Sequence, residues 1–475
     1  MDTSPKSTAN SKSSDSEVEQ ALYAVRQKIF PRAVHGWFAN WRIFFVLLTQ
    51  LIYYGLPWIP WNGRQAVLFD LANRKFFIFD WVFFPQDFIW LTGLLIISAY
   101  SLFLFTAIAG RLWCGFACPQ TVYTEIFLWV ERKLEGDRPK QIKLDKQPWN
   151  AEKLLRRGGK HIIWILIAFW TGFTFVGYFT PIQTLGFEFL TWTLGPWETF
   201  WVFFYGFATY GNAGFMREQV CKYMCPYARF QSVMFDPDTL IVSYDPGMGE
   251  PRGPRSKSTD YKSAGLGTCI DCGICVQVCP TGIDIRNGLQ YECIGCAACI
   301  DGCDQVMDKM GYPKGLIRYT TERVLQGEYT DKNILSHVFR PRVILYSVIL
   351  FAIGVAFLYT LATRVPLRVD VLRDRTTLSR ETDDGRIENL YQLEIINMDN
   401  AAHRYRISAT GAEGIAAITE STRLVAEPLE NLEIPMRLVV DPSNLKSRST
   451  PVEIVVTAED DPKLSKITKT TFLSR

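Results

Sequence analysis

Two cysteine-rich stretches, CIDCGICVQVCP at residues 269–280 and CIGCAACIDGCD at residues 293–304, decide the architecture of this 475-residue chain. Each follows the pattern C-x2-C-x2-C-x3-C, which holds iron–sulfur clusters in bacterial ferredoxins. Three closely spaced thiolates wrap three corners of a cubane, whereas the fourth lies too far along the chain to close the same cluster and ligates the other one. The spacing predicts two [4Fe–4S] clusters, one held by Cys269, Cys272, Cys275 and Cys303 and the other by Cys293, Cys296, Cys299 and Cys279.

Two other uses of such cysteines fit the pattern less well. Structural zinc sites use pairs of CxxC motifs rather than this run written twice, and disulfides do not persist in a reducing cytoplasm. Two details depart from the usual run, because Asp304 stands where the second repeat normally has Pro and the 13-residue spacer between the repeats is short. The ligand set stays intact, and only the turn after Cys303 is left open.

The apolar residues are clustered along the chain, and this clustering predicts a membrane protein. Hydrophobic residues make up 48% of the sequence and aromatic residues 14%, with many Trp and Tyr at the ends of long apolar runs, as at a membrane interface. About 20 apolar residues cross a bilayer. Five segments are therefore predicted to be spans rather than buried soluble helices: Ile43–Trp61, Phe88–Ala109, Ile162–Pro181, Trp197–Phe215 and Val343–Ala362. The run Phe76–Phe84 is too short to cross and is predicted to be an interfacial or re-entrant segment.

The distribution of Lys and Arg predicts the orientation of the spans. The loop 111–160 is rich in both residues, whereas the loop between the third and fourth spans has neither. Because positive residues favour the cytoplasmic side, the N-terminus, the 111–160 loop and the 216–342 segment are predicted to be cytoplasmic. An odd number of spans then places the C-terminus in the periplasm of a bacterium, with the chain as a multi-pass protein of the inner membrane.

Composition divides the chain into five regions. Residues 1–36 are predicted to be a disordered cytoplasmic tail, because their Ser-rich start has too few apolar groups to offset the entropy of ordering. Four spans at 37–235 are followed by a two-cluster ferredoxin-like domain at 236–338 and by the fifth span at 339–363. Residues 364–475 alternate β-branched runs with Asn, Asp, Gly and Pro, which predicts an immunoglobulin-like β-sandwich. This region has no Cys, so the predicted sandwich lacks a core disulfide.

The other four cysteines form two matching pairs, Cys114-Gly-Phe-Ala-Cys118-Pro and Cys221-Lys-Tyr-Met-Cys225-Pro, each after the cytoplasmic end of a predicted span. Pro is favoured at the first position of a helix, so the spans are predicted to end near Cys114 and Cys221, and a new helix to begin at each proline. The helix dipole lowers the pKa of a thiol at such an N-terminus. The repeated pattern therefore predicts a catalytic redox or metal-binding role, with buried structural thiols as the alternative.

Other signals are weaker or missing. His35, His161 and His337 fall next to span ends and are candidate metal or haem ligands, with an ordinary interfacial position as the alternative. The sequence has no G-x-G-x-x-G fingerprint of a dinucleotide site. A net charge of +3 gives no support for nucleic-acid binding.

Taken together, these motifs resemble the cytochrome c oxidase accessory proteins of the CcoG, FixG and RdxA family. The resemblance rests on the WCGFACPQT and CKYMCPYARFQ segments, the double ferredoxin run and the immunoglobulin-like region, and it covers nearly the whole chain. It implies a role in the assembly of cbb3-type oxidases through reduction of Cu(II) to Cu(I), with oxidase-assembly and copper-handling proteins as partners. It also marks the eight ferredoxin cysteines as cluster ligands and the other four as the family's membrane-side cysteines.

The residues themselves predict electron transfer, since two adjacent clusters carry one electron at a time. Copper reduction needs one electron per ion, and soft thiolate and thioether ligands favour Cu(I). Two alternatives stay open: a quinol-linked electron-transfer subunit of a respiratory reductase, and a non-catalytic assembly scaffold. The sequence does not identify the electron donor, nor any bound flavin or haem.

Overall fold

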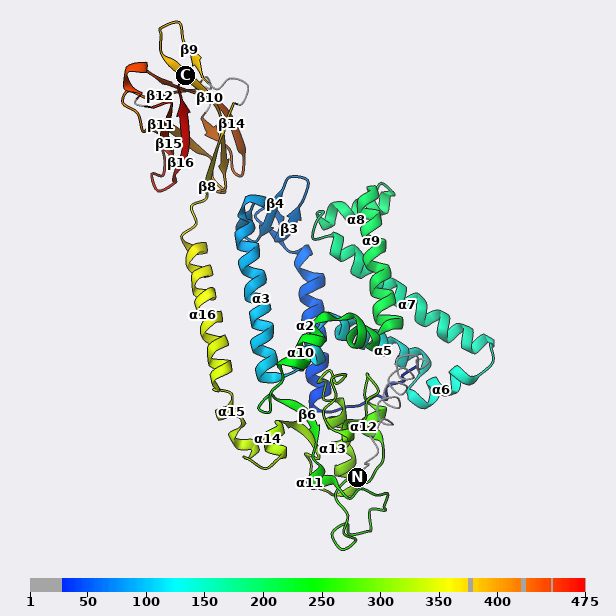
Figure 1. Cartoon of the computed structure of the whole chain (residues 1–475). Helices are drawn as coiled ribbons and strands as arrows, with labels where there is room; N and C mark the ends of the chain where they lie inside the picture. The colour runs from blue at the N-terminus through cyan, green and yellow to red at the C-terminus, as the bar shows by residue number, and fades with distance from the viewer. Residues whose placement is uncertain (1–27, 375–378, 420–423, 446, 475) are drawn as a thin grey trace, which may run out of the picture. The chain divides into compact units, whose positions relative to one another are not determined.

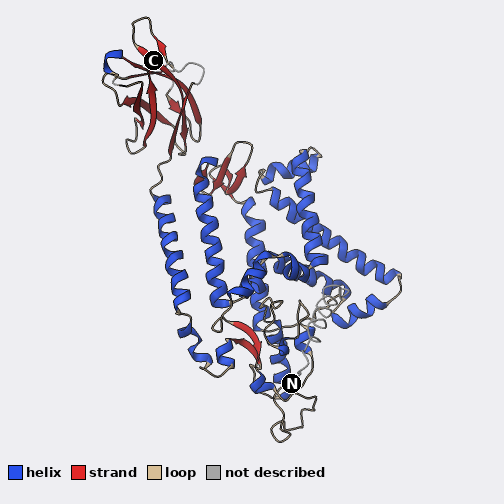
Figure 2. Ribbon diagram, viewed as in Figure 1, coloured by secondary structure: helices blue, strands red, loops and turns tan. Residues whose placement is uncertain are grey.

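The computed structural model describes residues 28–374, 379–419, 424–445 and 447–474. The chain divides into two compact units, Met1–Ile353 and Gly354–Arg475 (Figure 1). The first unit is mainly helical, and the second consists mainly of strands after its first residues (Figure 2). The boundary falls within the helix predicted at 339–363.

Helices of very different length build the first unit. In chain order they are α2 (Trp37–Gly55), α3 (Phe88–Ala109), α4 (Leu112–Phe116), α5 (Pro119–Glu135), α6 (Arg138–Lys146), α7 (Ala151–Val176), α8 (Ile182–Thr191), α9 (Pro196–Thr209), α10 (Pro226–Met234), α11 (Pro246–Gly249), α12 (Ile274–Gln277), α13 (Ala298–Met310), α14 (Glu322–Leu325), α15 (Ile334–His337) and α16 (Pro341–Ala362), which extends into the second unit. In Figure 1, α2 and α3 extend from the segments that carry the ferredoxin cysteines to a small sheet at their other end.

Three helices in the described part of the chain are long and apolar enough to cross a bilayer: Pro85–Ala109, Ala151–Val176 and Pro341–Ala362. They coincide with the predicted second, third and fifth spans. The predicted first and fourth spans do not reach this standard. Polar residues such as Asn40, Arg42 and Gln50 interrupt the 19-residue α2, and α9 has only 14 residues. The prediction of five spans is therefore not confirmed.

The ends of the helices also differ from the prediction. The first predicted span ends as a helix at Gly55 and continues as a 3-10 turn, Leu56–Trp58, and a short strand, β1 (Pro60–Trp61), which pairs with β2 (Arg64–Gln65).

In the charged 111–160 segment most residues are helical, and α7 already begins at Ala151. This start is fixed by the Asn150 side chain, which accepts a hydrogen bond from the Lys153 N–H at 2.8 Å and caps the helix.

The run 76–84, predicted to be an interfacial or re-entrant segment, forms strands of a small sheet. Strand β4 (Lys75–Ile78) pairs antiparallel with β3 (Val67–Asp70) on one side and with β5 (Trp81–Phe83) on the other. Phe77 and Val82 lie opposite each other in this sheet and are both buried. A two-residue alternation of buried and exposed side chains suits a strand and not a helix.

The ferredoxin-like region packs around one antiparallel pair of strands, β6 (Ile241–Tyr244) and β7 (Ile317–Thr320). Its core is shared by strand residues, cysteines of the two runs and helix α13, for example Val242, Ile317, Cys275 and Met307. Each run of cysteines thereby packs against this shared hydrophobic core.

Residues 28–36 pack on this region, which contradicts part of the predicted disordered tail at 1–36. The Arg32 N–H donates to the Gln277 carbonyl at 2.8 Å, and the His35 carbonyl accepts from the Gln305 amide. The Ala33 N–H donates to Asp137 at 3.0 Å. Residues 1–27 lie outside the described residues.

The second unit is a sandwich of two antiparallel sheets, as predicted for residues 364–475. One sheet has the order β12-β14-β10-β8, with β9 paired to β10, and the other has the order β13-β11-β15-β16. Its strands are β8 (Leu367–Arg373), β9 (Arg380–Glu381), β10 (Ile387–Asn397), β11 (His403–Thr410), β12 (Ala416–Thr419), β13 (Val425–Ala426), β14 (Asn431–Val440), β15 (Ser449–Ala458) and β16 (Ser465–Leu473). Alternate residues such as Leu393, Ile454 and Phe472 are fully buried between the sheets.

A buried histidine should make the stability of this sandwich depend on pH. The His403 ring lies 2.6 Å from an Asp460 oxygen and 3.0 Å from an Asp399 oxygen. Burial lowers the pKa of His403, but the two carboxylates outweigh this effect and raise the pKa above its usual 6.5. Their contribution is therefore fully present below the unfolded pKa and is lost as the pH rises through the folded pKa. Thermal unfolding of the β unit at pH values from about 6 upward should show falling stability. Asp460→Asn should flatten this dependence, and an equally steep profile in that variant would contradict the assignment.

Candidate iron–sulfur and four-cysteine site

The structure brings the eight ferredoxin cysteines together in two groups. One cavity is lined by Cys269, Cys272, Cys275 and Cys303. The second is lined by Cys279, Cys293, Cys296 and Cys299, and also by Cys275. Each fourth cysteine thus lies with the three of the other run, and the ligand assignment itself stays a prediction.

The residues present fit [4Fe–4S] clusters. Each cavity offers four thiols, the donor set that such a cluster requires. Among the described residues, no three His, Cys, Asp or Glu side chains are arranged to hold a single metal ion.

Helix α13 resolves the open question of the turn after Cys303. The helix begins at Ala298, passes through Cys303 and continues to Met310. A proline at position 304 would lie inside this helix, where its ring and its missing N–H are destabilising. The first run differs because α12 ends at Gln277, so Pro280 follows a helix instead of interrupting one.

The two C-x3-C-P pairs sit at helix starts, as their prolines predict. Cys118 is the N-cap of α5 and Cys225 the N-cap of α10. The preceding helices end earlier than expected: α3 ends at Ala109, and α9 ends at Thr209. Two π-helical stretches, Tyr210–Met216 and Val220–Met224, follow α9 and carry the chain to the second pair. Such stretches are frequent at functional sites.

Hydrogen bonds tie the two pairs to each other. The Gln120 amide, two residues after Cys118, donates to the carbonyls of Asn212 at 3.0 Å and Arg217 at 3.1 Å. The Cys114 thiol donates to the Gln231 side chain on α10 at 3.4 Å. Cys114, Cys118 and Cys225 all lie near enough to Cys221 to raise its pKa. Sequence positions more than a hundred residues apart therefore form one four-cysteine group: Cys114, Cys118, Cys221 and Cys225.

Burial dominates the acid–base chemistry of these thiols. It raises the pKa of Cys114 to about 11 and that of Cys221 to about 12. Burial also raises the pKa of Cys118, although backbone hydrogen bonds at the helix start oppose it. The expected lowering of the Cys118 pKa by the helix dipole is therefore wrong, because desolvation of the thiolate outweighs the dipole.

The four-cysteine group contacts the second cluster cavity directly. A Cβ built on Gly115, which stands between Cys114 and Cys118, would lie 2.7 Å from the Cys296 Cα and 2.8 Å from its nitrogen. Only glycine allows this approach. On the other pair, the Lys222 ammonium donates to the Thr281 carbonyl at 3.1 Å, close to Cys279. The segment that carries the first cysteine pair therefore packs directly against Cys296, a predicted cluster ligand.

The three histidines do not join a ligand group. His161 Nδ1 lies 3.0 Å from the Tyr210 hydroxyl, and its ring stacks on Phe215. His337 stacks on Tyr329 with ring centroids 3.9 Å apart. In the part of the chain that the structure describes, none of them belongs to a set of three side chains able to hold a metal ion.

Models of known protein families match three parts of the chain. A 4Fe-4S binding domain matches residues 87–136, which contain the first cysteine pair. A 4Fe-4S dicluster domain matches residues 216–322, which contain the second pair and all eight ferredoxin cysteines. A model described as the IG-like fold at the C-terminal of FixG matches residues 357–475.

Curated relatives match over most of the chain. Protein RdxA of Cereibacter sphaeroides is 42% identical over 413 residues, which cover 85% of this chain and 87% of the relative. Nitrogen fixation protein FixG of Rhizobium meliloti is 39% identical over 435 residues, which cover 85% and 82%. A crystal structure of a FixG-related protein from Vibrio parahaemolyticus matches over 97% of its chain and 23% of this one, with 27% identity and a TM-score of 0.21.

Two iron–sulfur domains joined to an immunoglobulin-like domain define an iron–sulfur electron-transfer protein. Identity of 39–42% over most of the sequence then fixes the group of proteins more closely. The chain belongs to the FixG/RdxA family.

Proposed function

We propose that this protein is a membrane-bound cupric reductase, which delivers single electrons to Cu(II) at the four-cysteine group. The three long apolar helices and the Lys/Arg distribution support a multi-pass protein of the bacterial inner membrane. The ferredoxin-like region and the N-terminus would lie in the cytoplasm, and the β-sandwich in the periplasm.

One observation carries the proposal: the four thiols of the two C-x3-C-P pairs converge beside a predicted ligand of the second cluster, Cys296. When bound, each [4Fe–4S] cluster supplies one electron as it passes from the reduced to the oxidised state. The thiols bind the copper ion, and Cu(II) plus one electron gives Cu(I). Soft sulfur ligands hold Cu(I) better than Cu(II), which favours the reduction.

The four thiols are not arranged around a single ion in the structure. Copper entry would therefore draw them together, and the π-helical stretch Val220–Met224 next to the second pair is a segment that can repack. Proteins that assemble a cbb3-type oxidase, or that carry copper to it, are the proposed recipients of Cu(I). This step rests on the family and not on a contact in the structure.

The test uses the full-length protein with its clusters reduced by dithionite and the excess reductant removed. Addition of Cu(II) should reoxidise the clusters and yield Cu(I), measured by EPR and by a Cu(I)-specific chelator. Replacing Cys118 and Cys225 together by Ser should abolish both reactions, because two of four soft ligands are lost. The EPR signals of the two clusters should stay intact, since neither residue lies in the cluster cavities. Tyr223→Phe, which changes an exposed residue of the same turn, is the matched control.

Two results would contradict the proposal. Reduction of Cu(II) at the wild-type rate by the double variant would make these thiols structural. An iron content of about twelve per chain, instead of about eight, would mean that the four cysteines hold a third [4Fe–4S] cluster. The match of residues 87–136 to a 4Fe-4S binding domain makes this second outcome a specific alternative.

A further inference from the structure

A cavity of about 330 Å³ lies between α2, α5 and the ferredoxin-like region. Four charged and twelve apolar residues line it. This volume and this mainly apolar wall are those of a small-molecule site. The residues come from three parts of the chain that are far apart in sequence, 31–47, 125–132 and 278–298, so the cavity exists only in the assembled unit.

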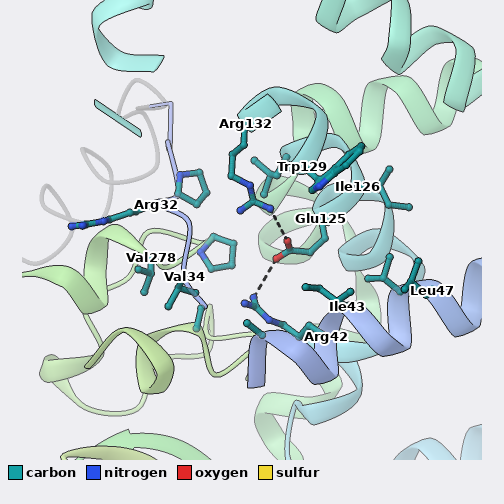
Figure 3. A pocket seen from close by; sticks show the side chains of 16 residues that line it. Arg32, Val34, Arg42, Ile43, Leu47, Glu125, Ile126, Trp129, Arg132 and Val278 are labelled. Carbon is teal, nitrogen blue, oxygen red and sulfur yellow. Dashed lines mark hydrogen bonds and ion pairs between the residues drawn. The ribbon is translucent and has the colours of Figure 1, made fainter. Parts of the chain in front are cut away.

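Charged groups gather at one part of the cavity wall. The Glu125 carboxylate on α5 lies between two guanidinium groups, 3.2 Å from Arg42 and 3.6 Å from Arg132 (Figure 3). Arg42 is buried, and its Nε has no hydrogen-bond partner among the residues that the structure describes. A buried donor without a partner is costly, and a ligand oxygen in the cavity would satisfy it.

Apolar side chains form another part of the wall. Ile43 and Leu47 follow each other along α2, and Trp129 stands on α5 (Figure 3). All three are exposed. On α2 they continue into further exposed apolar residues, Leu48, Leu51 and Ile52. A polar head bound at Glu125 therefore has an apolar route by which a hydrocarbon tail leaves the cavity.

The cavity also adjoins the second cluster. Ala298 lines both this cavity and the cavity of Cys279, Cys293, Cys296 and Cys299. Val278 and Pro280, the neighbours of Cys279, line it as well. A molecule bound here would therefore contact residues that are directly next to predicted cluster ligands in the sequence.

Hydrogen bonds fix the start of helix α2 to helix α13, which carries cysteines of the second run. The Asp301 carboxylate on α13 accepts hydrogen bonds from the backbone N–H groups of Phe38 at 3.3 Å and Ala39 at 2.7 Å. It thereby satisfies free donors at the start of α2. A Cβ on Gly36 would lie 2.4 Å from this carboxylate, so only glycine fits there. Helix α2 and the cluster-bearing helix α13 are thus fixed to each other.

We infer that this cavity binds the head of an isoprenoid quinol, which is the electron donor of the protein. The inference rests on the proposed function, for which it supplies the missing reductant. A flat head with oxygens at opposite sides matches an apolar slot with a charged end, and an isoprenoid tail matches the apolar rim. The three arginines and one carboxylate of the lining leave a positive charge that would also suit a phospholipid head, and the binding test separates this outcome from the quinol.

Oxidation of a quinol in this cavity needs acceptors for two electrons and two protons. A quinol loses two electrons and two protons and becomes a quinone, as its two O–H bonds break and two C=O bonds form. Two [4Fe–4S] clusters held by the eight ferredoxin cysteines would take one electron each. Glu125, the one carboxylate among the residues that line the cavity, accepts the first proton and passes it to solvent, and the second follows by the same route.

A binding test with the full-length protein addresses the site directly. An azido-benzoquinone with a decyl tail should, on illumination, label peptides from α2 and α5, and decylubiquinone should compete with it. Ile43→Trp fills the cavity and should abolish this labelling. Phe44→Trp places the same side chain at an exposed position of α2 outside the lining residues and should label like wild type.

A kinetic test addresses the role of Glu125. Cluster reduction by decylubiquinol should slow about a hundredfold in Glu125→Gln, because a positioned base is lost. Reduction by dithionite should not change in Glu125→Gln or in Ile43→Trp. Equal labelling in Ile43→Trp and wild type would overturn the inference, and so would displacement of the label by phosphatidylglycerol but not by decylubiquinone.

Failure of this inference and failure of the proposed function are distinguishable. Dithionite-reduced Ile43→Trp should still be reoxidised by Cu(II), because electrons then enter without the cavity. If wild type is labelled and reduced by quinol but is not reoxidised by Cu(II), the quinol site stands and the cupric reductase does not. If Cu(II) reoxidises the clusters while quinol neither labels nor reduces the protein, the donor site is wrong.

Discussion

Replacing Cys279 by Ser should remove the cluster whose other ligands are Cys293, Cys296 and Cys299, and should spare the cluster formed by the run in which Cys279 itself stands. Cys279 shares the cavity of these three cysteines, whereas Cys303 takes the fourth position in the cavity of the first run. A serine oxygen is a poor substitute for a thiolate at iron. Anaerobic iron and sulfide analysis should therefore fall from about eight to about four irons per chain, with one EPR signal left.

The reciprocal variant, Cys303→Ser, is the matched control. It should remove the cluster of Cys269, Cys272 and Cys275 and leave the cluster that Cys279→Ser removes. The two variants should therefore retain different EPR signals. Copper reduction should suffer more in Cys279→Ser, because the four-cysteine group contacts the second cavity at Cys296. Loss of the cluster of its own run in each variant, the first run's in Cys279→Ser and the second run's in Cys303→Ser, would show that the fourth ligands are not exchanged.

Sequence spacing predicts the iron–sulfur character of this region because spacing is a local property, and the match to a 4Fe-4S dicluster domain supports it. Four cysteines at fixed offsets reach one cluster or its neighbour whatever the rest of the chain does. The proline after each C-x3-C pair likewise predicts a helix start, which the structure has at Pro119 and Pro226. The alternating strands of residues 364–475 are local in the same sense, and their sandwich is confirmed.

Contacts between distant segments could not be predicted in this way. Asp301 shows no pattern in the sequence that links it to Ala39, yet its carboxylate fixes the start of α2. Gly115 reads as an ordinary spacer residue until its contact with Cys296 is seen. The predicted lowering of the Cys118 pKa failed for the same reason, because the burial that opposes it is produced by the fold and not by the helix start.

A buried ion network is a further feature that the charge pattern concealed. Lys160 counts toward a positive cytoplasmic loop in the sequence, but in the structure it is buried on α7. It lies 3.3 Å from Glu131 and 2.7 Å from Glu135 on α5. Arg217, in the turn before Cys221, lies 2.8 Å from Glu131. Burial raises the pKa of Glu131, but Arg217 and Lys160 outweigh it, and the pKa stays below its usual value, so the carboxylate is charged at neutral pH.

Replacing Glu131 by Gln should destabilise the first unit by about 3–5 kcal/mol, because it leaves two buried cations with too few partners. The loss should also reach the proposed copper site, since Glu131 holds Arg217, and the Arg217 carbonyl accepts a hydrogen bond from Gln120 next to the first cysteine pair. Thermal unfolding of the purified protein and Cu(I) binding are the two measurements. Glu152→Gln, which breaks the exposed Glu152–Arg156 pair on α7, is the control and should cost about 0.5 kcal/mol or less. Equal stability of the two variants would mean that the network adds nothing, and unchanged Cu(I) binding in a destabilised Glu131→Gln would separate the network from the four-cysteine group.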